Sequence, residues 1–139
     1  MKPAILVVED DAAMSQLLVE GLGRRGFVAR AAASGETALS LLEEHAFEAV
    51  VTDLNMKGLN GIETLQVLRE KDVDARIIIL TVSNSAEDLV GAIRAGSDGY
   101  ILKDTAPEDM VRLIKDAVLG KNAISAELSG LLASALRQE

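Results

Sequence analysis

Short apolar runs that alternate with helix-like segments are the feature that most limits how this chain can fold. Runs of this length, rich in Ile, Leu and Val and bounded by turn signals, are typical of strands buried on both faces. Between them, apolar residues recur every three or four positions, as on one face of a helix. The strand-like runs are Ile5–Val8, Phe27–Ala31, Ala49–Thr52, Ile77–Leu80 and Tyr100–Leu102. This βαβ alternation predicts an α/β fold, a doubly wound five-stranded parallel sheet with helices on both faces.

Polar residues mark where the helices should begin. Capping residues that precede an apolar helical pattern are Ser34, Asn60, Ser85 and Thr105, and either Asp10 or Asp11 can cap the first helix. After Gly120 an extra C-terminal helix is expected, capped by Ser125. Its apolar stripe consists of Leu128, Leu131, Leu132 and Leu136.

The composition excludes several classes of function. The chain has 139 residues, enough for one domain, and no cysteine, which excludes disulfides and thiolate chemistry. Its net charge of −8 disfavours direct binding to nucleic acids or anionic membranes. No apolar run approaches the ~20 residues of a membrane span, and the N-terminus does not resemble a signal peptide. A soluble cytoplasmic protein is expected.

Charged and polar residues stand at the ends of four predicted strands. The carboxyl ends of parallel strands meet at one edge of the sheet, where open α/β folds bind ligands. The residues that this brings together are Glu9, Asp10, Asp53, Thr81 and Lys103. Three carboxylates repel one another unless a cation lies between them, and ligands that offer only oxygen favour Mg²⁺. A lysine and a hydroxyl beside the ion suit phosphoryl oxygens, so the pattern indicates phosphoryl chemistry on Asp53.

Each of these residues alone has a plainer explanation. Asp10 is more readily a helix cap than a ligand, Lys103 a solvated charge, and Thr81 a hydroxyl bonded to the backbone. Their coincidence at four strand ends favours a site. Two other patterns carry no function: Gly21–Gly26 has the spacing G-x-G-x-x-G but follows a helix and precedes a strand, the reverse of a dinucleotide site. His45, the only histidine, is interpreted as a surface residue.

From residue 4 to about 119, the chain resembles the receiver domain of two-component response regulators. The resemblance implies a flavodoxin-like strand order 2-1-3-4-5 and phosphorylation by a sensor histidine kinase. It also implies a role for each matching position. These are Glu9 and Asp10 as the acidic metal-binding pair, Asp53 as phosphoacceptor and metal ligand, Asn55 as a backbone carbonyl ligand of Mg²⁺, Thr81 as switch hydroxyl, Lys103 as phosphoryl-binding lysine and Tyr100 as aromatic switch residue.

Finer motifs resemble the NarL/FixJ branch of that family, particularly the nitrate/nitrite regulators. They are Asp53–Met56, Leu80–Ser83 and Gly99–Asp104. Two positions depart from the wider family: Lys57 stands where many receivers have proline, and Asp104 follows the lysine where others have proline. The positive charge of Lys57 near the acidic pocket could alter the preference for metal or phosphodonor.

The NarL/FixJ branch normally continues into a helix-turn-helix domain. We therefore interpret residues 1–121 as the receiver domain and 122–139 as the start of a linker to a DNA-binding domain; a natural single-domain receiver is the alternative. The 139 residues are not expected to bind DNA themselves, whereas the longer protein would bind it and control transcription. Homodimerisation is possible, and no membrane partner is expected.

Two other functional classes fit the residues less well. Phosphohydrolases of the haloacid dehalogenase type place a second aspartate two residues after the nucleophile, where this chain has Asn55, which cannot transfer protons. A flavodoxin would need a phosphate loop and aromatic residues, which make up only 2% of the chain. The sequence therefore predicts a signalling domain and not an enzyme, with only Mg²⁺-dependent self-phosphorylation from acyl phosphates and autodephosphorylation.

Overall fold

The main sheet of the protein is parallel throughout. The computed structural model describes residues 2–53, 55–56, 59–70, 75–82, 85–120, 123–124 and 126–137. The strands of this sheet are β1 (Ala4–Val8), β2 (Val28–Ala32), β3 (Ala49–Asp53), β6 (Arg76–Thr81), β7 (Gly99–Leu102) and β8 (Ala123–Ile124). Their order is β2-β1-β3-β6-β7-β8. Since β6 and β7 are the fourth and fifth of the predicted strands, the order β2-β1-β3-β6-β7 confirms the predicted order 2-1-3-4-5. The two-residue β8 is an addition that the sequence analysis does not predict.

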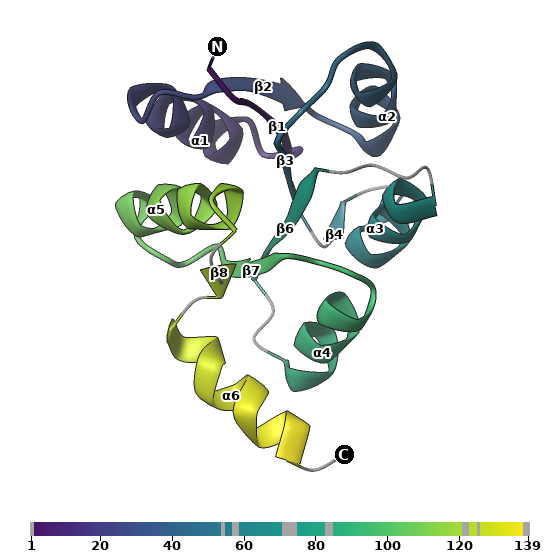
Figure 1. The fold of residues 1–139 in the computed structure, drawn as a ribbon, viewed down its shortest axis with the longest axis vertical. Coiled ribbons are helices and arrows are strands. Elements are labelled where there is room, and N and C mark those ends of the chain that lie inside the picture. Colours follow the sequence, from purple (N-terminus) through teal and green to yellow (C-terminus); the bar gives the residue numbers. More distant parts are fainter. Residues whose placement is uncertain are drawn as a thin grey trace.

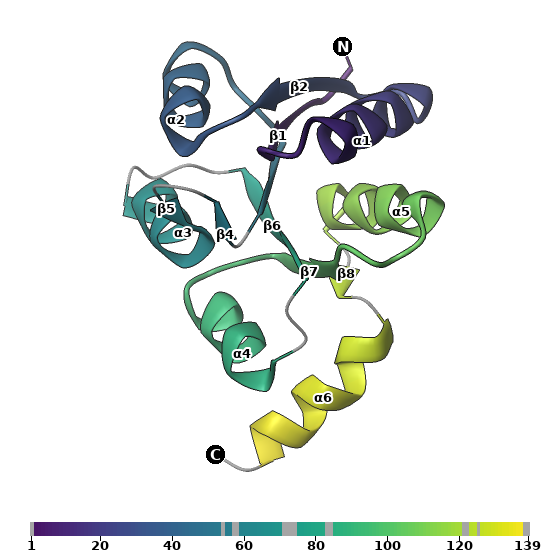
Figure 2. The same cartoon turned by 180° about the vertical axis from the view of Figure 1, so that it is seen from behind.

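Helices cover both faces of the sheet. They are α1 (Ala12–Arg24), α2 (Gly35–Glu44), α3 (Gly61–Glu70), α4 (Ala86–Arg94), α5 (Pro107–Val118) and α6 (Ala126–Arg137). Figures 1 and 2 show α1 and α5 on one face and α2, α3 and α4 on the other, with α6 beyond α4 at one end of the molecule. A short antiparallel hairpin, β4 (Asn55–Met56) with β5 (Leu59–Asn60), precedes α3.

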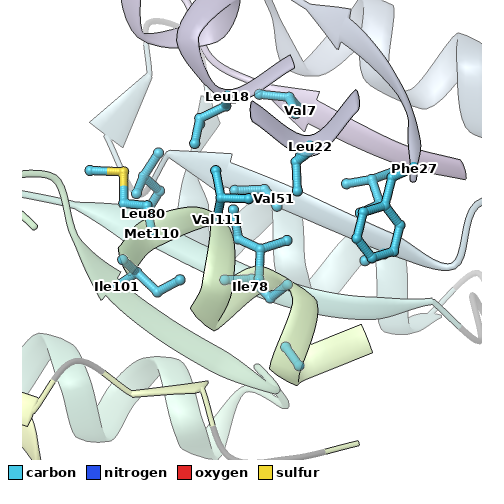
Figure 3. Packing of buried hydrophobic residues seen from close by; sticks show 14 residues of the cluster. Val7, Leu18, Leu22, Phe27, Val51, Ile78, Leu80, Ile101, Met110 and Val111 are labelled. Carbon is cyan, nitrogen blue, oxygen red and sulfur yellow. The ribbon is translucent and has the colours of Figure 1, made fainter. Parts of the chain in front are cut away.

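The core is predominantly aliphatic on both faces of the sheet, as the strand runs predict. Alternate residues of β1 enter different clusters: Val7 packs under α1 and α5, whereas Leu6 packs on the side of α2. Burial on both faces explains why the strands are continuous apolar runs and not alternating ones. The cluster under α1 and α5 includes Leu18, Leu22, Phe27, Met110 and Val111 (Figure 3).

Three of the four predicted helix caps that can be compared with the structure are confirmed. The carboxylate of Asp11 accepts bonds from the backbone N–H groups of Ala13 and Met14 at 3.0 and 3.2 Å, so Asp11 and not Asp10 caps α1. Ser34 and Ser85 cap α2 and α4. The prediction for Thr105 is wrong: α5 is preceded by Ala106, with no side-chain cap. Pro107 in the first turn has no N–H that needs a partner, and its fixed φ suits a helix start.

Two predicted caps cannot be compared with the structure. Ser125 lies outside the described residues, and so does the side chain of Asn60.

The glycine-rich stretch Gly21–Gly26 forms the end of α1 and the turn that follows it, as predicted. Gly26 has φ of 92°, which suits glycine, and β2 begins two residues later at Val28. Within α1, a Cβ on Gly21 would lie 2.7 Å from Cγ2 of Val111, so glycine there lets α1 and α5 approach closely. His45 is on the surface, also as predicted: its side chain is 45% exposed and lies 4.0 Å from the carboxylate of Glu44.

Candidate functional site

The predicted site residues converge at the carboxyl edge of the sheet. Glu9 directly follows β1, Asp53 ends β3, Thr81 ends β6 and Lys103 directly follows β7. Glu9, Asp53 and Thr81 are buried, at 2, 6 and 0% exposure. Polar side chains this deeply buried need partners, and for Glu9 and Asp53 the ammonium of Lys103 is one.

Lys103 joins two of the strand ends. Its Nζ lies 2.8 Å from Oε2 of Glu9 and 2.8 Å from Oδ2 of Asp53. Its backbone N–H donates to the carbonyl of Thr81 at 2.8 Å, which fixes the start of the Lys103 side chain beside β6. The ammonium group therefore bridges the two buried carboxylates across the middle of the sheet.

The electrostatics of the site reflect burial and crowding. Burial raises the pKa of Glu9, and the charge of Asp53 adds to this, while the hydrogen bond from Lys103 opposes it. For Lys103, burial acts to lower the pKa, but the hydrogen bonds to Asp53 and Glu9 outweigh it and raise the pKa. The lysine is thus held in its charged form and Glu9 is easier to protonate than an exposed glutamate.

The acidic residues form a group that could hold a metal ion. Carboxylate oxygens of Glu9, Asp10 and Asp53 all lie within 4.8 Å of one another. Asp10 is exposed at the mouth of the group, and Oε1 of Glu9 accepts a bond from the N–H of Asp11 at 3.1 Å, which orients the glutamate. Oxygen ligands alone suit a hard ion such as Mg²⁺, which retains several waters and takes few carboxylates.

Asn55, the predicted carbonyl ligand, lies in β4 and pairs with Asn60. Its role as a ligand stays a prediction. Lys57, the departure from the wider family, lies outside the described residues.

Thr81 and Tyr100 lie on the same face of the sheet. In the register of β6 and β7, Ile79 pairs with Tyr100 and Thr81 with Leu102, so alternate residues place Thr81 and Tyr100 towards α4. Tyr100 is fully buried, in a cluster with Ile79 and Leu102. The structure therefore brings together the hydroxyl and the aromatic residue of the predicted switch, although it does not test their movement.

Sequence reasoning missed part of the surroundings. A surface cavity of about 390 Å³ lies beside the acidic pair, lined by α1 residues, among them the buried Ser15, and by Ala31–Ala33 at the end of β2. No signal in the sequence marks the lining residues at the end of β2, because the predicted second strand carries no charged or polar chemistry. They leave open space next to Glu9 and Asp10.

Comparison with known proteins defines the class. Residues 5–115 match the family described as "Response regulator receiver domain". This match covers more than half of the chain, so the protein belongs to the response regulator receiver family, as the sequence motifs predicted. Among the described residues, no helix is long and apolar enough to cross a membrane.

Individual relatives point to one branch. The chain is 39% identical over 139 residues to "Nitrate/nitrite response regulator protein NarL" of Escherichia coli (strain K12), covering 98% of this chain and 64% of that protein. It is 43% identical over 99 residues to the "Nitrate/nitrite response regulator protein homolog" of Haemophilus influenzae, covering 71% of this chain and 48% of that protein. The chain thus spans about half to two thirds of the length of these relatives.

Solved structures agree with the fold. A "two-component response regulator, LuxR family, from Aurantimonas sp. SI85-9A1" aligns over 100% of both chains with a TM-score of 0.89 at 30% identity. A "DNA-binding response regulator, LuxR family, from Staphylococcus aureus" aligns over 84% of this chain and 98% of the other, with a TM-score of 0.76 at 27% identity. This chain is a receiver domain similar to those of LuxR-family response regulators.

Proposed function

We propose that Asp53 accepts a phosphoryl group from a sensor histidine kinase, with Mg²⁺ held by Glu9, Asp10, Asp53 and the backbone carbonyl of Asn55. The observation that carries this proposal is the position of Asp53. Its carboxylate is buried at the end of β3 and pairs with the Lys103 ammonium, within 4.8 Å of two further carboxylates. A nucleophile, a cation for the phosphoryl oxygens and a candidate metal site thus lie side by side.

The chain's own residues can perform the transfer. A carboxylate oxygen of Asp53 forms the bond to phosphorus while the bond to the donor nitrogen breaks and its electron pair leaves with the donor imidazole. Lys103, already 2.8 Å from Oδ2 of Asp53, can pair with an oxygen of the new phosphoryl group. Mg²⁺, when bound, would neutralise charge on the carboxylates and on the transferred group.

The switch residues support a signalling role. A phosphoryl group on Asp53 would draw the hydroxyl of Thr81 towards it, since Thr81 ends the neighbouring strand β6. Tyr100 lies on the same face of the sheet as Thr81 and would respond by favouring the rotamer that points inward, towards the core. The two states need differ by only a few kcal/mol for the new contacts to shift the population. The changed surface would then be formed by α4, β7 and α5.

The chain should not turn over external substrates. We infer that its chemistry is limited to self-phosphorylation from acyl phosphates and to hydrolysis of its own phosphoryl group, because Asn55 stands where phosphohydrolases carry a proton-transferring aspartate.

The output is proposed from the relatives. We take residues 1–121 as the receiver and 122–139 as the start of a linker to a DNA-binding domain through which the longer protein controls transcription. With a net charge of −8, these 139 residues should not bind DNA themselves.

Phosphotransfer tests the proposal directly. Incubated with acetyl phosphate and Mg²⁺, the protein should gain the mass of one phosphoryl group, labile to hydroxylamine, and a chelator should prevent the gain. Asp53→Asn should abolish it. Asp104→Asn, which changes an exposed carboxylate one residue beyond Lys103, should behave like wild type. Phosphorylation of Asp53→Asn at the wild-type rate would show that the acceptor lies elsewhere.

A further inference from the structure

The C-terminal segment of the chain folds back onto the edge of the sheet that carries Tyr100. After α5 the backbone turns at Gly120, whose φ is 84°, and β8 then pairs in parallel with β7. Ile124 of β8 is the register partner of Tyr100. Beyond β8, α6 contacts α4 and lies beside it in both views (Figures 1 and 2). We refer to β8 and α6 together as the C-terminal latch.

One described side chain of α6 joins the core. Leu131 is half-buried and packs against the cluster that contains Tyr100. The remaining members of that cluster are Ile79, Leu89, Ala92, Leu102 and Ile93. Leu136, of the same predicted stripe, is 54% exposed, and the side chains of Leu128 and Leu132 lie outside the described residues. Of the apolar stripe expected on the C-terminal helix, Leu131 therefore packs on this domain.

Tyr100 lies between the site and the latch. Its strand is paired with β6, whose last residue is Thr81, and with β8, and its fully buried side chain shares a cluster with Leu131. A change in the side-chain position of Tyr100 would therefore alter the surface on which α6 rests. By the same contacts, an α6 docked on α4 would favour the buried position of Tyr100.

We propose that the C-terminal latch is a regulatory element whose docking is coupled to the phosphoryl group on Asp53. This inference rests on the proposed function, which assigns the inward Tyr100 to the phosphorylated state. Docked α6 and phosphorylated Asp53 both favour the same buried Tyr100, so each stabilises the other. The coupling is reciprocal, because both act on one conformational equilibrium. A partner that recognises the state of this domain would then contact α6 as well as α4.

The test compares two leucines of α6 in the full chain. Leu131→Ala removes the contact with the Tyr100 cluster, and Leu136→Ala is the matched control on an exposed position. The probe is fluoroberyllate with Mg²⁺, which mimics a phosphoryl group on a carboxylate. Tyr100 is the only tyrosine and the chain has no tryptophan, so its fluorescence reports this site alone. Leu131→Ala should weaken fluoroberyllate binding about fivefold or more, and Leu136→Ala should match wild type.

A measurement on the wild-type chain does not depend on how well a variant folds. Fluoroberyllate with Mg²⁺ should slow the hydrogen exchange of α6 amides.

A conservative variant provides a further control. Leu131→Met, which keeps an apolar side chain at the contact, should restore most of the affinity for fluoroberyllate that is lost in Leu131→Ala.

The outcomes separate the latch from the phosphorylation site. Equal affinities in wild type, Leu131→Ala and Leu136→Ala would overturn the coupling and leave the assignment of Asp53 intact. Tighter binding by Leu131→Ala, or unchanged or faster exchange in α6, would also overturn it. If the wild-type chain fails to bind fluoroberyllate at all, the proposed function fails and the latch with it.

Discussion

Two charged clusters occupy opposite edges of the same sheet, and they differ in how their charge is balanced. At the carboxyl edge, the ammonium of Lys103 lies among the carboxylates of Glu9, Asp10 and Asp53. At the amino edge, the guanidinium groups of Arg69 and Arg76 face the carboxylate of Asp98, with Nη atoms 2.8 and 3.7 Å from its oxygens. Counted over the side chains that the structure describes, the first cluster has more carboxylates than cations and the second has more cations than carboxylates.

At the amino edge, backbone groups also form hydrogen bonds with the charged side chains. Arg69 donates from Nη2 to the carbonyl of Gly96 at 2.6 Å and from Nη1 to that of Ala75 at 3.3 Å, while Asp98 accepts from the N–H of Ile77 at 2.9 Å. The cluster thus ties α3 to the starts of β6 and β7. At the carboxyl edge the surplus lies on carboxylates, which can bind a cation. An uneven number of charges therefore does not by itself distinguish a metal-binding site from a structural cluster. Excess carboxylates can bind a metal ion, whereas excess guanidinium groups can be satisfied by backbone carbonyls.

The largest effect on stability should come from the amino edge. Asp98→Ala leaves the N–H of Ile77 and two guanidinium groups without their carboxylate and should lower the free energy of unfolding by about 2–3 kcal/mol. Urea denaturation of the metal-free protein measures this. Asp104→Ala, on an exposed carboxylate, should remain within about 0.5 kcal/mol of wild type. A similar small loss in Asp98→Ala would show that the cluster does not hold these elements together.

A smaller effect, dependent on metal, is expected at the carboxyl edge. Lys103→Met removes the ammonium between two buried carboxylates and should cost about 1–2 kcal/mol in the presence of a chelator. Mg²⁺ should recover part of this loss, because it supplies the missing positive charge. Denaturation of the variant with and without Mg²⁺ measures the recovery, and Asp98→Ala serves as the control that Mg²⁺ should not rescue. Equal losses with and without metal would contradict the imbalance described for this edge.

The smallest expected effect is on how folding stability depends on pH. Because the pKa of Glu9 is raised above its ordinary value of 4.5, the metal-free folded protein binds more protons than the unfolded chain just above that pH. This contribution favours folding at acidic pH and is lost as the pH rises through the raised pKa. Glu9→Gln should remove this dependence, whereas Glu48→Gln, on an exposed residue, should keep it. The measurement is the unfolding midpoint of wild type, Glu9→Gln and Glu48→Gln in chelator as a function of pH. If the midpoints of wild type and Glu9→Gln change with pH in parallel, the raised pKa of Glu9 does not contribute to stability.

The carboxyl edge could be predicted from the sequence because topology alone determines it. Once the runs ending at Glu9, Asp53, Thr81 and Lys103 are parallel strands, their carboxyl ends must lie side by side. The amino-edge cluster could not be predicted in the same way. Arg69 reaches Asp98 from the end of a helix, across 29 positions of sequence, and the rotamer of a long side chain carries no periodic signal.

Local competition explains two further differences. The two residues of β8 are too few to show a strand pattern, and β7 determines their conformation by pairing with them. At α5, the pattern Thr105-Ala106-Pro107-Glu108 satisfies a capping box, but Pro107 determines where the helix begins. In the first case the neighbouring strand determined the conformation, and in the second the proline outweighed the capping preference of Thr105.

The pairing of β8 with β7 also has a consequence for how the chain avoids self-association. The residues of β7, Gly-Tyr-Ile-Leu, are all buried and uncharged, and a bare strand of this kind would be a template for intermolecular pairing and aggregation. The opposite border strand, β2, is mostly exposed and carries Arg30, a charge of the type that discourages such pairing. During synthesis β7 leaves the ribosome more than 20 residues before β8. The nascent domain is therefore most prone to aggregate in that interval, and any shortened form lacking Ala123 and Ile124 would retain the hazard permanently.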